Sequence, residues 1–372
     1  MKIAQIAPLM ESVPPRQYGG TERVVSYLTE ELVRLGHDVT LFASGDSATS
    51  ARLLSFCDTA LRLDLRVKDP APHHIVMLDA VREMAHEFDV LHFHVDVLHY
   101  PLIRDFVDRT VTTLHGRLDM PESRRLYSVF SGAPLVSISF DQRKPMPPVN
   151  WAGMVYHGLP RDLLTFNPAP KDGGYFAFLG RISPEKRPDR AIEIATRAGA
   201  RLKIAAKIDR VDQDYWTQRI KPMVDGNPMV EYIGEIDETQ KAQFLGDAAA
   251  LLFPIDWPEP FGMVMIESMA CGTPVIAFRR GSSPEIVDGG RSGFLVESVD
   301  EAVAASQRVR DLDRRGVRAC FEARFTVARF ARDYVSIYES LPGVRSKSWR
   351  MRTGVLTDFD RPASRAASFR SS

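Results

Sequence analysis

The sequence has few cysteines, no long apolar run and no net charge. Its three cysteines, Cys57, Cys271 and Cys320, lie far apart and lack the spacing of metal ligands, which argues against a disulfide scaffold or a structural zinc site and fits a reducing cytoplasm. No apolar run approaches the roughly 18 residues of a membrane-spanning helix, and the apolar N-terminal run stops too early for a secretory signal. The formal net charge of zero argues against a protein whose whole surface binds nucleic acid or an anionic membrane.

The zero net charge is the sum of unequal parts. Residues 1–170 carry a net charge of −3, residues 171–341 carry −2, and residues 342–372 carry +5. The last segment lacks helical or strand periodicity, so we predict that it is a disordered basic tail. Two interpretations stay open for this tail: a solvated segment without a partner, and a weak tether to anionic lipid or to another protein.

Short apolar runs alternate with amphipathic stretches in residues 1–170. The run Lys2–Ala7 is typical of a strand, and Thr21–Leu35 has apolar residues at helical spacing. Further strands are expected at 38–43, 90–93, 110–114, 135–139 and 154–156, with a helix at 77–87. This alternation predicts a parallel sheet that is covered by helices on both faces.

The alternation restarts after a stretch rich in Pro, Gly and Lys at 167–174, which we interpret as a linker. Strands are expected at 175–179, 202–206, 230–233, 249–254 and 275–278, and helices at 188–198, 214–224, 238–245, 262–270, 299–312 and 327–341. We therefore predict an α/β protein of two Rossmann-like, doubly wound domains, 1–170 and 171–325. The segment 326–341 is expected to be a helix that packs back on the first domain. Ligands should bind in the cleft between the domains, at the carboxyl ends of the strands.

The most informative stretch runs from Pro258 to Ala277. A strand ends before it, and a helix is predicted to begin at about Phe261–Gly262, so the free N–H groups of the first helical turn can bind an anion. These N–H groups belong to Phe261, Gly262, Met263 and Val264. Two carboxylates, Glu259 and Glu267, flank this anion site and are able to accept hydrogen bonds from sugar hydroxyls. Alternatively both are solvated acids, although a lone acid in so apolar a helix calls for a partner.

A group of histidines follows the strands of the first domain. His92 and His94 share one face of a strand, with Asp96 after them, so a metal pair is conceivable. We favour structural hydrogen bonding or contact with an acceptor, and we expect no metal. Asp-x-Asp spacings occur at 212–214, 311–313 and 358–360, in predicted helical or tail positions where they are not expected to hold a metal. Cys271 is interpreted as a small packing residue and not as a nucleophile.

The sequence resembles the family-4 retaining glycosyltransferases of the GT-B fold. The resemblance covers about residues 1–341 and rests on five blocks that occur in the expected order. They are Tyr18-Gly19-Gly20-Thr21-Glu22, Thr113-Leu114-His115-Gly116, Gly180-Arg181 with Lys186, Glu259 with Glu267 and Cys271-Gly272-Thr273-Pro274-Val275, and Gly281-Ser282-Ser283-Pro284-Glu285. The resemblance implies that two Rossmann-like domains face each other across a cleft that binds a nucleotide-diphosphate sugar.

The physical chemistry of these blocks agrees with that expectation. Arg181 and Lys186 follow a strand end that faces the cleft, where two fixed cations would stabilise the charge of a departing diphosphate. Gly19 and Gly20 allow close approach of the backbone to phosphates. This glycine pair is not the Gly-x-Gly-x-x-Gly fingerprint of dinucleotide-binding proteins, which weighs against an oxidoreductase. The plainer alternatives are two solvated loop cations and an ordinary tight turn.

The resemblance also implies roles for individual residues. Glu267 would accept hydrogen bonds from the ribose, Glu259 would accept them from the sugar, and His115 would lie near the donor sugar. Gly234, Glu235 and Ile236 would meet the base. The expected reaction is retaining transfer of a hexose, with UDP-glucose as the first choice of donor and GDP-mannose as the second. The acceptor would be a glycan, a glycolipid or a small molecule, bound by the first domain, and no metal or other cofactor is expected.

Some positions depart from the family pattern, and other functions stay open. The glycine-rich loop of the family reads Ala205-Ala206-Lys207-Ile208-Asp209 here, so Lys207 and Asp209 are expected to reach the nucleotide or the sugar instead. The alternatives are a nucleotide-sugar epimerase or phosphorylase of the same fold, and a non-enzymatic, two-lobed sugar-binding protein. We expect the protein in the cytoplasm, with weak peripheral contact to the membrane as an option. Neither a nucleic-acid partner nor a particular oligomeric state is indicated.

Overall fold

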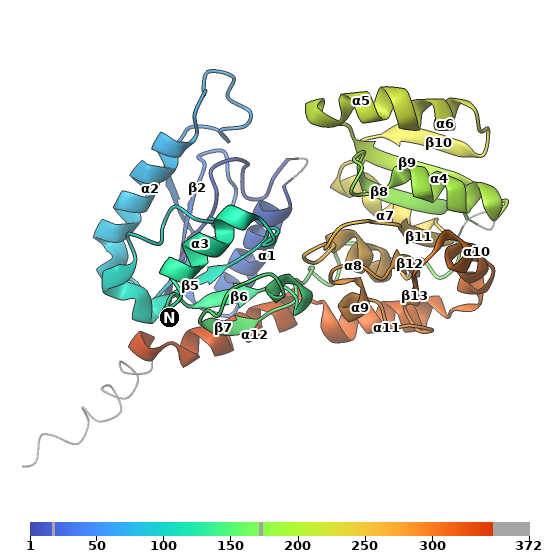
Figure 1. Ribbon diagram of the computed structural model, residues 1–372. Helices are drawn as coiled ribbons and strands as arrows, with labels where there is room; N and C mark the ends of the chain where they lie inside the picture. Colours follow the sequence, from blue (N-terminus) through green and yellow to red (C-terminus); the bar gives the residue numbers. More distant parts are fainter. Residues whose placement is uncertain (17–18, 171–173, 345–372) are drawn as a thin grey trace, which may run out of the picture.

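The computed structural model describes residues 1–16, 19–170 and 174–344. Two parallel sheets lie side by side, one built from residues 2–154 and the other from residues 176–296 (Figure 1). The α/β class and the two Rossmann-like units that the sequence predicts are confirmed. Tyr18 and most of the predicted basic tail lie outside the described residues.

The first sheet has the strand order β3-β2-β1-β4-β5-β6-β7, and all neighbouring strands are parallel. The strands are β1 (Lys2–Ile6), β2 (Asp38–Ala43), β3 (Arg52–Ser55), β4 (Val90–Phe93), β5 (Thr110–Thr113), β6 (Leu135–Ser137) and β7 (Trp151–Met154). Because β1 lies between β2 and β4, the winding direction reverses there, and such a reversal leaves a crevice at the carboxyl ends of the strands.

Helices cover both faces of the first sheet. The helices α1 (Gly20–Arg34) and α12 (Val327–Ser340) pack together on one face, where Val24 and Leu28 meet Phe330 and Tyr334. The helices α2 (Ala71–Met84) and α3 (Pro121–Val129) lie on the other face (Figure 1). Burial of nearly continuous apolar strands between these two layers is what a parallel sheet requires.

The second sheet repeats this arrangement with the order β10-β9-β8-β11-β12-β13, again with parallel neighbours. The strands are β8 (Phe176–Arg181), β9 (Leu202–Lys207), β10 (Val230–Gly234), β11 (Ala250–Phe253), β12 (Val275–Phe278) and β13 (Gly293–Val296). The reversal of winding falls between β8 and β11. Both sheets therefore have a crevice next to their first strand.

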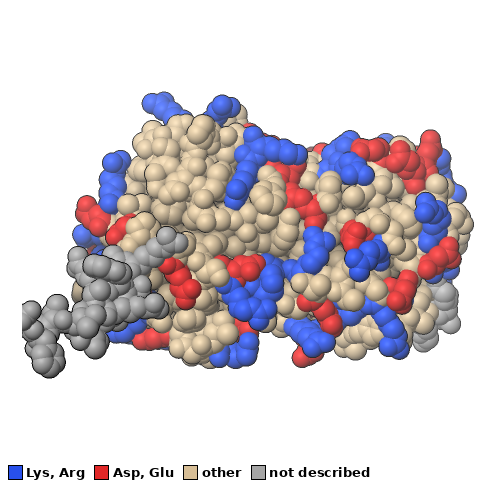
Figure 2. Space-filling model, turned by 90° about the horizontal axis from the view of Figure 1, so that it is seen from below, with Lys and Arg blue, Asp and Glu red and all other residues tan. Residues whose placement is uncertain are grey.

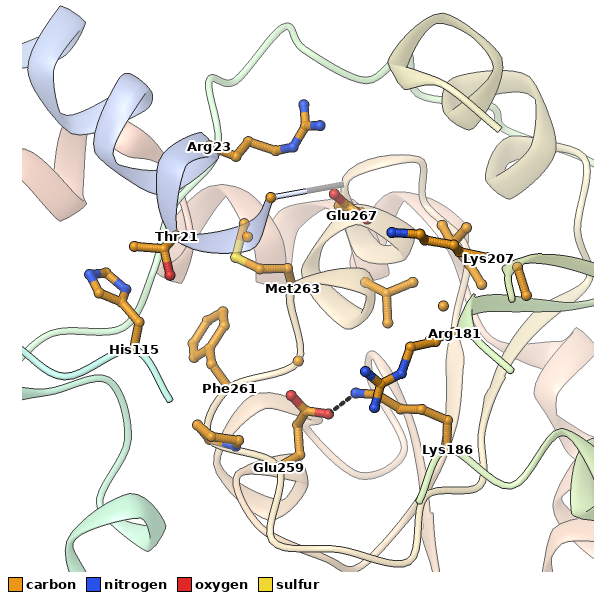
Figure 3. Close-up of a pocket in the computed structure, with 18 of the residues that line it drawn as sticks. Thr21, Arg23, His115, Arg181, Lys186, Lys207, Glu259, Phe261, Met263 and Glu267 are labelled. Carbon is orange, nitrogen blue, oxygen red and sulfur yellow. Dashed lines mark hydrogen bonds and ion pairs between the residues drawn. The ribbon is translucent and has the colours of Figure 1, made fainter. Parts of the chain in front are cut away.

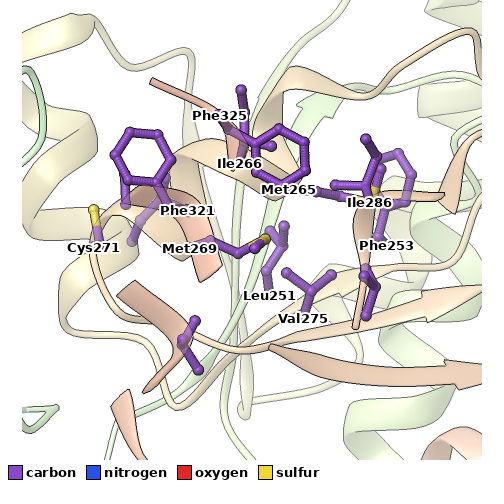
Figure 4. Packing of buried hydrophobic residues seen from close by; sticks show 14 of the residues in the cluster. Leu251, Phe253, Met265, Ile266, Met269, Cys271, Val275, Ile286, Phe321 and Phe325 are labelled. Atoms are coloured by element: carbon purple, nitrogen blue, oxygen red, sulfur yellow. The ribbon is translucent and has the colours of Figure 1, made fainter. Parts of the chain in front are cut away.

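Two helical layers also enclose the second sheet. One layer holds α4 (Pro188–Arg197) and α10 (Val299–Arg308), and the other holds α7 (Glu238–Gly246), α8 (Met263–Ala270) and α11 (Arg314–Arg324). Met265 and Met269 of α8 pack against Leu251, Val275 and Phe321 (Figure 4). This apolar packing fixes the direction in which the N-terminus of α8 points.

Shorter elements complete the chain. They are α5 (Gln213–Tyr215), α6 (Lys221–Asp225), α9 (Ser283–Ile286), the π-helical turn η6 (Trp216–Ile220), and the 3-10 turns η1 (Ala85–Glu87), η2 (Arg104–Arg109), η3 (Asp141–Arg143), η5 (Arg210–Asp212) and η7 (Val309–Asp311). No helix within residues 1–16, 19–170 and 174–344 is long and apolar enough to cross a membrane.

The chain passes between the two sheets at two adjacent places. The Leu159 amide donates to the carbonyl oxygen of Phe325 at 2.9 Å, and the amide of Val327 donates to the carbonyl oxygen of Leu159 at 2.8 Å. The two crossing segments therefore lie side by side, and α12 follows on from the second. Figure 2 shows basic and acidic side chains interspersed over one face of the molecule, so no broad patch of a single charge sign covers that face.

Several elements differ from the sequence-based predictions. The strand expected at 154–156 is β7, at Trp151–Met154, and the helix expected at 214–224 is divided by the π-helical turn η6. The strands β3 and β13 and the helices α3, α9 and α11 were not predicted. The helix α11 has charged residues at five of its eleven positions, and one of its four buried side chains is Arg314, so its apolar face is short.

Candidate functional site

A pocket of about 810 Å³ lies between the two domains, at the carboxyl ends of strands from both sheets (Figure 3). The predicted site residues that line it are Gly19, Gly20, His115, Arg181, Lys186, Lys207, Glu235, Ile236, Glu259, Phe261, Gly262, Met263, Val264 and Glu267. Gly234 is outside the lining that the described residues form. It ends β10, and its two successors reach the pocket. Residues that are far apart in the sequence thus meet where the two crevices face each other.

The N-terminus of α8 opens into this pocket. Gly262 caps the helix with φ 78°, a left-handed conformation that glycine adopts without strain. A Cβ atom at this position would lie 2.7 Å from Met265 Cε and 3.0 Å from Phe253 Cζ. The Met265 amide donates to the carbonyl oxygen of Gly262 at 3.0 Å. The N–H groups that precede Met265 lie at the start of the helix, where they have no acceptor inside the helix. These groups and the helix dipole favour an anion at this position.

A second glycine holds the loop before α8 in place. A Cβ atom on Gly281 would lie 2.3 Å from the backbone nitrogen of Glu259, so only glycine allows the two backbones to approach so closely. The neighbouring Ser282 donates from its amide to the Glu259 carbonyl oxygen at 2.9 Å and from its hydroxyl to the Phe261 carbonyl oxygen at 2.7 Å. These contacts fix the backbone from which the Glu259 side chain extends.

Glu259 and Lys186 form an ion pair inside the pocket (Figure 3). The ammonium group of Lys186 also lies 4.9 Å from the centre of the Trp257 ring, within the range of a cation–π contact. The Lys186 side chain is 23% exposed, so its charge is accessible to a ligand while its position is held from two sides. An anionic ligand would find this cation already in place.

Glu267 has the partner that a lone acid in an apolar helix requires. Lys241 of α7 donates to Glu267 Oε1 at 2.8 Å, and it also lies 3.4 Å from Glu238. Burial alone would lower the pKa of Lys241, but the two carboxylates outweigh burial and raise the pKa. Arg23 of α1, in the first domain, forms an ion pair with Glu238 of the second domain. The expected ribose-binding acid therefore belongs to a network that spans the cleft.

Arg181 is surrounded by carboxylates. Its guanidinium nitrogens lie 3.5 Å from Glu185, 3.5 Å from Asp209 and 3.4 Å from Asp212. Lys207 lies 3.0 Å from Asp209, at the end of the neighbouring strand. The two cations are thus held on adjacent strand ends by acids, and both side chains line the pocket.

His115 lines the pocket at the end of the first-domain strand β5. Its Nε2 lies 2.9 Å from Nδ1 of His94, and burial lowers the pKa of His115 to about 3. His92 contacts the hydroxyls of Tyr338 and Thr113, both at 2.7 Å. These histidines are neutral and hydrogen-bonded to each other or to protein hydroxyls. Within the described ranges no group of three or more His, Cys, Asp or Glu side chains is arranged to hold a metal ion.

Four functional candidates were given no role of their own in the sequence analysis. Lys241 and Trp257 position the predicted residues Glu267 and Lys186, and Glu22 adds a buried carboxyl group to the pocket wall. The fourth is Gln5, whose side chain contacts His94. The apolar surroundings of Glu267 signalled a missing cation, but nothing local in the sequence pointed to Lys241 as its source. Gln5 stands in an otherwise apolar strand, a pattern that could have marked it as a buried polar contact.

The fold and the pocket define a class of protein, namely two facing Rossmann-like domains with an anion-binding helix N-terminus in the cleft. The protein-family model described as "Glycosyltransferase Family 4" matches residues 18–142 of the sequence. The family model described as "Glycosyl transferases group 1" matches residues 163–314. The chain belongs to the group 1, family-4 glycosyltransferases and has the GT-B fold.

Individual relatives agree with this assignment. D-inositol 3-phosphate glycosyltransferase 2 of Catenulispora acidiphila is 31% identical over 209 residues, which are 47% of this chain and 46% of that protein. The chain thus spans about half the length of this curated relative. Sucrose-phosphate synthase from Thermosynechococcus elongatus has the same fold, with a TM-score of 0.75 at 19% identity over 91% of this chain and 98% of that one. Anabaena Alr3699/HepE, solved with UDP, has a TM-score of 0.69 at 17% identity over 92% and 100% of the two chains.

Proposed function

We propose that the protein is a retaining hexosyltransferase that uses a nucleotide-diphosphate sugar, with UDP-glucose as the first choice of donor and GDP-mannose as the second. The observation that carries this proposal is the convergence of Arg181, Lys186 and the N-terminus of α8 on one pocket, next to Glu259 and Glu267. Two cations and a helix N-terminus suit a diphosphate, and two carboxylates suit the hydroxyls on either side of it. The UDP in the Anabaena structure supports the choice of uridine.

The donor would lie mainly on the second domain. The first-turn N–H groups of α8, together with Arg181 and Lys186, would hold the diphosphate. Glu267 would accept hydrogen bonds from the ribose, and Glu259 would accept them from the sugar. Lys207 lies at the end of β9, within reach of the same phosphates or the sugar, and Glu235 and Ile236 line the side on which the base would lie.

The proposed reaction is attack of the acceptor on the same face of the sugar from which the diphosphate leaves. The bond between the anomeric carbon and the phosphate oxygen breaks, and the acceptor oxygen forms a new bond to that carbon. The acceptor hydroxyl proton passes to the departing phosphate oxygen, so the reaction needs no side-chain base. Arg181 and Lys186 would lower the barrier by stabilising the charge that develops on the diphosphate. These cations would supply the charge that a divalent metal ion provides in other enzymes.

The first domain would hold the acceptor, which we propose to be a glycan, a glycolipid or a small molecule. Gly19 and Gly20 would allow this domain to come close to the donor phosphates when the cleft is occupied. A Cβ atom on Gly19 would lie 2.6 Å from Pro15 Cβ, whereas Gly20 has open space on its Cβ side. Gly20 is therefore the position at which the ligand can approach the backbone.

A screen against nucleotide sugars tests this function. The purified full chain is incubated with UDP-glucose, GDP-mannose and related donors, and thermal shift and donor hydrolysis are measured. We expect at least one donor to raise the melting temperature and to be hydrolysed slowly in the absence of acceptor. NMR of the transferred product should show the donor's anomeric configuration. Conversion of donor to an epimeric nucleotide sugar would instead identify an epimerase, and binding without turnover would identify a sugar-binding protein.

A further inference from the structure

A line of buried hydrogen bonds connects α12 to the pocket. Gln5 of β1 donates from Nε2 to the hydroxyl of Tyr338 at 3.1 Å, and its Oε1 lies 2.7 Å from Nε2 of His94. Nδ1 of His94 in turn lies 2.9 Å from Nε2 of His115. Gln5 and Tyr338 are fully buried and His94 is 1% exposed, so water does not compete for these bonds.

The orientation of the Gln5 amide sets the direction of each bond in this line. A carbonyl oxygen can only accept, so the proton between Gln5 and His94 belongs to Nε2 of His94. A neutral imidazole has a single N–H, which makes Nδ1 of His94 an acceptor. The 2.9 Å contact must then be donated by Nε2–H of His115. Nδ1 of His115 is left with a free lone pair, and it is buried without a partner among the described residues.

The surroundings keep these rings neutral. The ring centre of His94 lies 4.0 Å from that of His92, and the centre of His115 lies 5.4 Å from that of His157. A second proton on any one ring would place a positive charge among buried imidazoles. Burial lowers the pKa of His94 well below its ordinary value and that of His115 to about 3.

The opposite orientation of the Gln5 amide would reverse the whole line. Nδ1 of His115 would then carry an N–H that is buried without an acceptor. A buried N–H without a partner is rarer than an acceptor with a free lone pair, so the observed direction is the favourable one. The hydroxyl of Tyr338 accepts from Nε2 in this orientation, and because a hydroxyl can also donate, it is the buried N–H of the reversed line that disfavours the opposite orientation.

We propose that Gln5 and His94 are positioning residues that fix His115 in the tautomer protonated on Nε2, so that Nδ1 accepts a hydrogen bond from a hydroxyl group of the bound sugar. This inference rests on the proposed function, because it takes the ligand to be a nucleotide sugar. It restricts which chemical group of a ligand can lie next to His115. A carboxylate or phosphate oxygen only accepts hydrogen bonds and cannot pair with Nδ1, so the ligand group next to this nitrogen is a hydroxyl.

The tautomer can be measured directly in the full chain. The protein is labelled with ¹⁵N in its histidine rings, and long-range ¹H–¹⁵N spectra are recorded, with the His115→Gln variant used for assignment. We expect the His115 signals of a neutral ring with its proton on Nε2. A ring protonated on Nδ1, or on both nitrogens, overturns the proposal. The measurement needs no turnover, so failure of the proposed function to transfer sugar would not affect it.

Variants test whether Gln5 sets the tautomer. Gln5→Leu should give a mixture of His115 tautomers and lower kcat by about tenfold, the loss expected for one hydrogen bond. Tyr175→Phe is the control, because it removes a tyrosine hydroxyl that donates to the carbonyl oxygen of Phe244 at 2.7 Å in the second domain, outside this line. It should leave the tautomer and the rate unchanged. An unaltered tautomer in a folded Gln5→Leu variant overturns the role of Gln5. If that variant fails to fold, the wild-type spectrum and a Tyr338→Phe variant decide the question.

Ligand titration tests the contact to the sugar. Addition of the donor that is turned over, UDP-glucose or GDP-mannose, should shift the His115 Nδ1 resonance, whereas UDP or GDP alone should leave it in place. Equal shifts with the nucleotide alone, or no shift with a donor that the protein turns over, contradict a contact between Nδ1 and a sugar hydroxyl.

Discussion

Lys186 is held by a carboxylate and by an aromatic ring, yet it remains partly exposed in the pocket. Glu259 would lose its counter-ion in a Lys186→Ala variant, and the proposed diphosphate would lose one of its two fixed cations. We expect the turnover number to fall by more than about tenfold while the fold is retained, because the lost stabilisation falls on the departing group. Lys203→Ala is the control, since Lys203 pairs with Glu231 on the surface. A near wild-type transfer rate in Lys186→Ala would remove Lys186 from the mechanism.

Glu267 offers a separate test of donor binding. A Glu267→Ala variant removes the proposed acceptor for the ribose hydroxyls but leaves Lys241 next to Glu238, so the buried ammonium keeps a counter-ion. Calorimetric titration with UDP-glucose should show affinity that is weaker by roughly 1.5–3 kcal/mol, the range for a hydrogen bond to a charged group. Glu231→Ala, on an exposed strand position, should bind the donor normally. Unchanged affinity in Glu267→Ala would mean that the ribose lies elsewhere.

The buried side chain of Glu22 makes the stability of the fold depend on pH. Burial raises the pKa of Glu22 from 4.5 to about 7, and the charges of Glu11 and Asp96 add to this. The folded state therefore keeps a proton between pH 4.5 and 7 that the unfolded chain has lost. Stability from this group is complete below pH 4.5 and is lost as the pH rises through 7, by at most about 3 kcal/mol.

A Glu22→Gln variant isolates this effect from the histidines, which titrate equally in both proteins. The loss of melting temperature between pH 5 and 7.5 should be smaller in Glu22→Gln than in the wild type. Thermal melts followed by circular dichroism measure the difference between the two profiles. Parallel profiles across this range would show that Glu22 ionises as an ordinary surface carboxylate.

At the scale of elements, the start of α8 depends on one backbone conformation. A Gly262→Ala variant places a side chain at φ 78°, which costs about 1–2 kcal/mol, and the new Cβ also crowds Met265. We expect a lower melting temperature together with weaker donor binding. Gly199→Ala is the control, because Gly199 has φ 61° but open space around its Cβ position. If Gly262→Ala behaves like Gly199→Ala in both measurements, the crowding at the helix start has no consequence for the site.

The elements also show how far sequence reasoning reaches. The apolar strands and the amphipathic helices α1 and α4 were predictable, because their periodicity reflects burial on one face. The site motifs were predictable because glycines, acids and cations directly follow strand ends. The helix α3 was not, since only one of its side chains is buried. Partners from distant elements, such as Lys241 for Glu267 and Gln5 for His94, depend on tertiary packing that local patterns do not encode.

At the scale of the whole molecule, polar contacts join the two domains on either side of the pocket. Near the crossing segments, Glu285 accepts hydrogen bonds from the amides of Phe140 at 2.8 Å and Asp141 at 2.7 Å. Across the cleft, Arg117 lies 3.0 Å from Glu185, and Arg23 pairs with Glu238. The domains are thus joined by covalent crossings at one side and by ion pairs at the other. Ion pairs of this kind contribute little each and weaken with salt, so they suit a cleft that opens and closes.

The double variant Arg23→Ala/Arg117→Ala should therefore shift the molecule toward an open cleft. Small-angle X-ray scattering at low salt should give a larger radius of gyration for the variant than for the wild type. High salt should reduce the difference in radius of gyration between the two proteins, because it screens the ion pairs in the wild type. Arg161→Ala is the matched control, because Arg161 forms a surface pair with Glu322 at 3.1 Å away from the pocket. Identical scattering of the double variant and the wild type at every salt concentration would show that the contacts at and near the crossing segments set the angle between the domains without these two ion pairs.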